Sequence, residues 1–112
     1  MTATLTTGTA HPLATLVTPT EQGIASRVLG RTTGGNLTLF ALDAGQELSE
    51  HTSPFEAFAI VLEGAVAFTI DGTPIDAAAG TIVRLPAHVP HAVHARTGAR
   101  MLLAMLRELK TT

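Results

Sequence analysis

Short apolar runs, each ended by glycine, proline or a small polar turn, most restrict the fold that this sequence can adopt. The chain contains 10 Gly and 6 Pro, and the runs between them leave little room for a long helix. Turn signals recur about every 8–12 residues, a spacing typical of β-sandwiches and β-barrels. The sequence therefore predicts an all-β protein made of short antiparallel strands.

Local patterns place the individual strands. Asp71-Gly72 lies between two apolar runs and is the strongest hairpin signal in the chain. Residues 36–42 carry apolar side chains on both faces, as a strand covered on both sides does, and residues 30–35 have the composition of a polar turn. We expect strands over residues 24–29, 36–42, 58–62, 65–70, 74–76, 81–85, 91–95 and 101–106.

Chain length and N-terminal composition predict the domain organisation. At 112 residues the chain is long enough to bury one core, so residues 13–112 are expected to form a single domain. Residues 1–12 are rich in threonine, and we expect them to form a flexible tail or an arm exchanged between two copies.

Composition excludes several classes of partner. Net charge is −2 and no basic patch is present, which argues against nucleic acid. No apolar stretch approaches the roughly 18 residues of a membrane helix, so we expect no membrane partner. Without cysteine there are no disulfides or thiolate sites. The N-terminus lacks the features of a signal peptide, which predicts a cytoplasmic protein.

Hydrophobic residues make up 46% and charged residues 14%, which favours a homodimer, with residues 13–29 pairing across the interface.

Two segments about thirty residues apart carry a common framework of glycine, proline and histidine. The framework residues are Gly45, His51 and Gly64 in the first segment and Gly80, Pro86 and His91 in the second. In type and spacing they resemble the paired motifs of the cupin superfamily, G-x(5)-H-x-H-x(3,4)-E-x(6)-G and G-x(5)-P-x-G-x(2)-H-x(3)-N. The resemblance is to the small, single-domain, RmlC-like cupins of the conserved-barrel family, and it implies a small antiparallel jelly-roll barrel, the double-stranded β-helix.

The resemblance also implies a divalent-metal site with four ligand positions, of which this chain keeps two. His51 and His91 occupy their positions, whereas Ser53 stands at the second histidine and Ala57 at the glutamate. A serine hydroxyl is a poor ligand at neutral pH, and two imidazoles alone bind a divalent ion such as Fe, Zn, Ni or Mn weakly.

Glu56 and His88 are the residues that could complete such a site. With His51 and His91, Glu56 has the composition of a two-histidine, one-carboxylate site. Side chains five residues apart on a regular strand point to opposite faces, however, so Glu56 reaches His51 only if a bulge or a turn near Pro54 resets this parity. His88, in the loop 86–90, would supply a third imidazole or lie exposed.

The resemblance leaves three functions open. The one we favour is a small-molecule-binding barrel with a weak or degenerate divalent-metal site at His51, His91 and Glu56, in which Ser53, Glu56 and His88 contact the ligand. The second is a metal-free isomerase or lyase with His51 and His91 as acid and base. The third is a metal-dependent enzyme of the oxygenase type.

Overall fold

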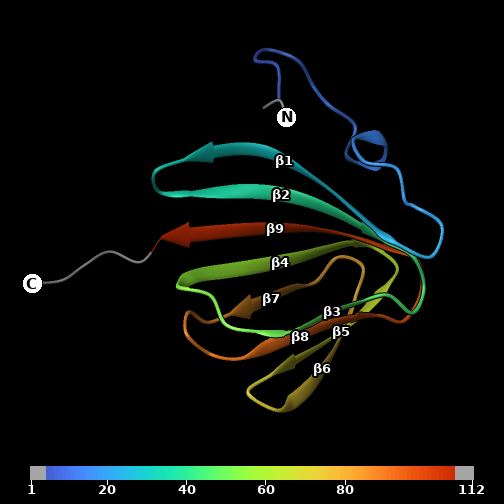
Figure 1. Ribbon diagram of the computed structural model, residues 1–112. Coiled ribbons are helices and arrows are strands. Elements are labelled where there is room, and N and C mark those ends of the chain that lie inside the picture. Colours follow the sequence, from blue (N-terminus) through green and yellow to red (C-terminus); the bar gives the residue numbers. More distant parts are fainter. Residues whose placement is uncertain (1–4, 108–112) are drawn as a thin grey trace, which may run out of the picture.

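The computed structural model describes residues 5–107, which are mostly β-strand (Figure 1). No helix in this range is long and apolar enough to cross a membrane. The elements in chain order are the short 3-10 helix η1 (Leu13–Thr15) and the strands β1 (Ile24–Thr32), β2 (Gly35–Leu42), β3 (Glu47–His51), β4 (Phe55–Glu63), β5 (Ala65–Ile70), β6 (Thr73–Ala78), β7 (Ile82–Leu85), β8 (His91–Ala95) and β9 (Ala99–Arg107).

The strands form two antiparallel sheets that pack face to face, which confirms the predicted jelly-roll barrel. One sheet has the order β1-β2-β9-β4-β7 and the other the order β3-β8-β5-β6. Neighbouring strands are often distant in the sequence, and Figure 1 shows β9 between β2 and β4. This crossed order brings the two motif segments together, since β3 belongs to the first segment and its neighbour β8 to the second.

Alternation along the strands builds the core between the sheets. On β4, Ala57, Ala59 and Val61 are 3%, 0% and 0% exposed and face the other sheet. That sheet contributes Val66 and Phe68, both fully buried. Burying a side chain of this size stabilises the fold by about 1.5–3 kcal/mol, so this layer is what holds the two sheets together.

A second apolar layer covers the outer side of the five-stranded sheet. Leu39 and Ala41 point outward from β2 and are nevertheless fully buried, because the segment that contains Val17 lies over them. Arg100 donates a hydrogen bond to the Val17 carbonyl and fixes this segment. Leu42, on the inner face of β2, is also fully buried, which confirms the prediction of a strand covered on both sides.

The turn predicted at residues 30–35 is shorter than expected. β1 continues to Thr32 and β2 begins at Gly35. The register shifts between Val28 and Gly30, so this glycine marks a β-bulge inside the strand rather than the end of it. By contrast, the predicted hairpin at Asp71-Gly72 is confirmed, with φ of 49° and 81° at the two residues and β5 and β6 on either side.

Strand β3 was not predicted. Of its residues only Leu48 is partly buried, and the others are exposed and polar. The strand forms because it pairs with β8 at the edge of the sheet, and such tertiary pairing leaves no periodic signal in the sequence. In the segment expected to be a tail, residues 1–4 lie outside the described range, and the Leu5 amide donates a hydrogen bond to the Leu29 carbonyl at 3.0 Å.

Candidate functional site

Two histidines from the two motif segments meet where β3 pairs with β8. His51 is directly opposite His91 in the register. Their ring centroids are 4.4 Å apart and the ring planes make an angle of 67°, an edge-to-face contact. His51 is exposed, whereas His91 is only 5% exposed. One imidazole of the pair therefore faces solvent and the other is held inside the barrel.

The backbone fixes the orientation of both rings in the same way. Nδ1 of His51 lies 2.8 Å from the Ser49 carbonyl, and Nδ1 of His91 lies 3.1 Å from the Val89 carbonyl. A carbonyl oxygen only accepts hydrogen bonds, so each Nδ1 carries a proton, and in the neutral form of each ring the lone pair is on Nε2. The sites that remain for a partner are thus two Nε2 acceptors.

Burial lowers the pKa of His91 below its usual value, and repulsion from His51 lowers it further. The hydrogen bond to Val89 opposes these two effects. The pKa of a free histidine is 6.5, so His91 is neutral at pH 7.

The pair lies at the ends of β3 and β8 and lines a cavity of about 240 Å³ between the two sheets. Its polar lining residues are His51, Ser53 and His91. The remaining lining residues are apolar and come from both sheets: Phe40, Leu48, Ala57, Leu85, Val93, Met101, Leu103 and Met105. The site therefore combines an apolar cavity with one polar end, which His51, Ser53 and His91 form.

Ser53 lies at this polar end, as its place in the motif suggested. Its Oγ accepts a hydrogen bond from the Phe55 amide at 3.1 Å. Accepting that bond leaves the hydroxyl proton of Ser53 available to a ligand.

His88 does not line the cavity with the other predicted site residues. Its side chain is exposed in the loop between β7 and β8, while its amide donates a hydrogen bond to the Ser53 carbonyl at 2.8 Å. The backbone at His88 has a φ of 64°, a left-handed conformation that favours glycine. Glycine is the residue that the resembled motif has at this position, so this chain keeps the backbone geometry with a histidine.

Glu56 is not brought to the histidine pair either. It precedes the inward-facing Ala57 on β4 and so points to the opposite face. There Arg84 donates a hydrogen bond to its carboxylate, and this bond lowers the pKa of Glu56. Residues 52–54 connect β3 to β4, and the two strands lie in different sheets. Glu56 is on the outward side of β4, so the carboxylate that the sequence offered as a third metal ligand belongs to an outer ion pair.

The predicted ligand set therefore does not assemble. Within residues 5–107 no three His, Cys, Asp or Glu side chains lie close enough together to hold a metal ion. The donors at the cavity are the Nε2 atoms of His51 and His91 and the hydroxyl of Ser53. Stable divalent sites use three or four protein ligands, so this donor set fits such a site poorly.

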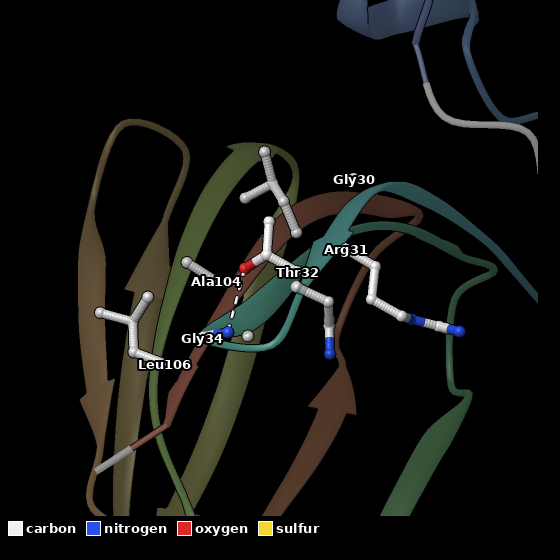
Figure 2. Close-up of a pocket in the computed structure, with 9 residues that line it drawn as sticks. Gly30, Arg31, Thr32, Gly34, Ala104 and Leu106 are labelled. Carbon is white, nitrogen blue, oxygen red and sulfur yellow. Dashed lines mark hydrogen bonds between the residues drawn. The ribbon is translucent and has the colours of Figure 1, made fainter. Parts of the chain in front are cut away.

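A larger hollow, of about 470 Å³, lies on the outer side of the five-stranded sheet (Figure 2). It adjoins the β1–β2 hairpin, where the Gly34 amide donates a hydrogen bond to Thr32 Oγ1 at 3.1 Å. Figure 2 shows Arg31 extending away from Ala104 and Leu106. Among the described residues that line this hollow there is no acid, histidine or cysteine, so we take the smaller cavity as the candidate site.

Met101 and Met105 are the main lining residues whose role the sequence left undecided. Both lie in the apolar run of β9, and the pattern of that run does not separate core residues from residues that border a cavity.

Known proteins support the fold and the motif assignment. A family model described as "Cupin domain" matches residues 38–106. A conserved protein of unknown function from Streptococcus pyogenes is 29% identical, with a TM-score of 0.89 over 97% of this chain and 96% of its own. A cupin superfamily protein from Desulfitobacterium hafniense is 25% identical, with a TM-score of 0.87 over 96% and 99%.

A conserved-barrel cupin 2 protein from Leptotrichia buccalis is 33% identical, with a TM-score of 0.80, and the match covers 84% of this chain but 46% of that one. No curated protein matches the chain.

Proposed function

The chain belongs to the cupin family, and from this premise we propose that its barrel binds a small molecule in the cavity that ends at His51 and His91. The observation that carries this proposal is the combination of an apolar cavity with two imidazoles of fixed orientation at its end. A volume of about 240 Å³ exceeds the roughly 150 Å³ that suffices to bind benzene.

Ligand binding would satisfy polar groups that the protein itself leaves open. The Nδ1 atoms are occupied by backbone carbonyls, so a ligand in the cavity meets the two Nε2 lone pairs and the hydroxyl of Ser53. A few placed polar groups in an otherwise apolar pocket are typical of small-molecule sites. We assign no step to Fe, Zn, Ni or Mn, because two imidazoles are half of the usual ligand set.

A second function, proton transfer without a metal, is favoured by the unequal environments of the two histidines. His91 is buried and neutral, which suits a general base, while the exposed His51 beside it can exchange protons with solvent. Under this proposal Nε2 of His91 takes a proton from the bound molecule, and His51 returns one after it has received a proton on Nε2 from solvent.

We also propose that the protein forms a homodimer through the outer face of the five-stranded sheet. Ile82 and Leu106 are 60% and 48% exposed there. They continue the apolar layer that the N-terminal segment covers only in part, and exposed apolar side chains that adjoin such a layer are typical of subunit interfaces.

Methionine methyl NMR tests the ligand-binding proposal. The chain has 3 Met, and two of them, Met101 and Met105, line the cavity, so selective ¹³C labelling gives few and assignable signals. Benzene serves as a general probe of an apolar cavity. We expect saturable shifts of both cavity methyl groups; the absence of any shift at the solubility limit of benzene would contradict the proposal.

A further inference from the structure

The cavity limits the size of its ligand. Benzene, with six carbons, occupies an apolar cavity of roughly 150 Å³. Scaled to the cavity between the sheets, which is about 240 Å³, the same packing admits a molecule of about ten non-hydrogen atoms. A nucleotide or an oligosaccharide is too large to be enclosed in this space, whereas a single ring with a short substituent fits.

The polar end selects the functional group. His51 and His91 present Nε2 acceptors, and Ser53 keeps a hydroxyl proton to donate. A ligand hydroxyl can donate to one group and accept from the other at the same time. A carboxylate only accepts, and among the described residues that line the cavity there is no Lys or Arg to balance its charge.

The apolar walls favour an aromatic ring. Phe40, Met101 and Met105 line the cavity together. Methionine sulfur and aromatic rings attract one another at a ring edge, and two aromatic rings stack or meet edge to face. A sugar of the same size would place several hydroxyl groups against side chains that cannot bond to them.

We propose that the ligand of this site is a small neutral phenol, with its ring between the methionines and its hydroxyl at His51, His91 and Ser53. The proposal deepens the proposed function and rests on it, since it names the chemical class that the same cavity takes.

Three probes that differ at one substituent test the phenol assignment by calorimetry. They are 4-ethylphenol, 4-ethyltoluene, which has a methyl group in place of the hydroxyl, and 4-ethylbenzoate, which has a carboxylate there. We expect 4-ethylphenol to bind with a Kd about tenfold or more below that of 4-ethyltoluene, because the isostere covers the buried His91 without forming a hydrogen bond to it. We expect no saturable binding of 4-ethylbenzoate.

The outcomes separate this inference from the proposed function. Equal Kd values for 4-ethylphenol and 4-ethyltoluene would overturn the phenol assignment and leave cavity binding intact. Tighter binding of 4-ethylbenzoate would overturn it in favour of an anion site. If neither benzene nor any of the three probes shifts the methionine methyl signals, both proposals fail.

Histidine variants show which side chains bind the hydroxyl group of the ligand. His51→Leu changes an exposed residue and is expected to fold, as far-UV circular dichroism can verify. It should reduce the preference for 4-ethylphenol over 4-ethyltoluene to about threefold or less, since a single hydrogen bond contributes about 1 kcal/mol. His94→Leu is the matched control, because His94 lies on the outer side of β8 and donates to Glu47 at 3.0 Å. An unchanged preference in His51→Leu, or an equal loss in His94→Leu, would contradict the assignment.

Discussion

Leucine substitutions at two neighbouring alanines of β4 distinguish open cavity from packed core. Ala57 and Ala59 face the same side of the strand and are 3% and 0% exposed, but only Ala57 lines the cavity. Ala57→Leu adds three carbons that can enter the cavity. At about 0.8 kcal/mol per buried methylene, the unfolding free energy should rise by about 2 kcal/mol. Ala59→Leu forces the same carbons into filled space and should lower it by about 1–3 kcal/mol.

Urea denaturation followed by far-UV circular dichroism measures both effects, since the chain has no Trp or Tyr to report by fluorescence. The leucine at position 57 would take up about 75 Å³, scaled from benzene in its cavity. 4-Ethylphenol should therefore bind about tenfold or more weakly to Ala57→Leu, because the remaining space is too small for it. If Ala57→Leu destabilises the protein as much as Ala59→Leu does, the space beside Ala57 is not open and the reasoning is refuted.

Because the pKa of His91 is lowered in the folded state, the unfolded chain binds more protons than the folded chain as the pH falls below 6.5. The free energy of unfolding should therefore decline as the pH falls below that value. Urea denaturation at a series of pH values measures this decline, and a His91→Leu variant that shows the same decline would contradict the assignment to His91. Gly64→Ala should lower the free energy of unfolding by at least about 2 kcal/mol more than Gly45→Ala does. Both glycines have positive φ, but a Cβ at Gly64 would lie 2.2 Å from the Gly98 carbonyl, whereas a Cβ at Gly45 has nothing within 4 Å. Equal urea midpoints for the two variants would argue against this reason. Elemental analysis after dialysis should find substoichiometric metal in the wild type and near-stoichiometric metal in Ser53→His/Ala57→Glu, since positions 51, 53, 57 and 91 all line the cavity; a stoichiometric wild type would show that two imidazoles suffice. Sedimentation at micromolar concentration should show a dimer that Ile82→Glu weakens, because Ile82 is 60% exposed on the outer face; a wild-type monomer would refute the dimer.

The fold was predictable because its signals are local. Gly45, Gly64 and Gly80 have φ of 84°, 78° and 89°, and residues with side chains rarely adopt this conformation. The positions of these glycines in the sequence therefore indicate where the backbone turns. Strand β3 lacked such a signal, since its exposed polar residues gain their structure from pairing with β8.

The candidate site was predictable only in part. The motif spacing predicted that His51 and His91 belong to one site, and the strand register places them opposite each other. Parity counted from His51 along one strand indicated that Glu56 faces away. The two residues lie on different strands, β3 and β4, and Glu56 faces away because it alternates with the buried Ala57 on β4, where it pairs with Arg84. The cavity was not predictable, because whether Met101 fills the space between two sheets or borders it depends on the volumes of all the facing side chains.

The loss of two motif ligands has a physical consequence for the site. With Ser53 and Ala57 in place of a histidine and a glutamate, the cavity lacks the charge that would hold a metal ion, and it gains apolar surface. The histidines that remain keep the orientation that frees Nε2. The same two residues can therefore form hydrogen bonds to a neutral ligand.

Long-range ¹H–¹⁵N NMR of the imidazoles above pH 7, with and without 4-ethylphenol, tests the central claim most directly. We predict that His51 and His91 both carry their proton on Nδ1, as their bonds to the Ser49 and Val89 carbonyls require, and that both Nε2 signals move when the probe binds. A proton on Nε2 of either ring would contradict the account. So would Nε2 signals that stay fixed at a probe concentration that saturates the shifts of the cavity methionines.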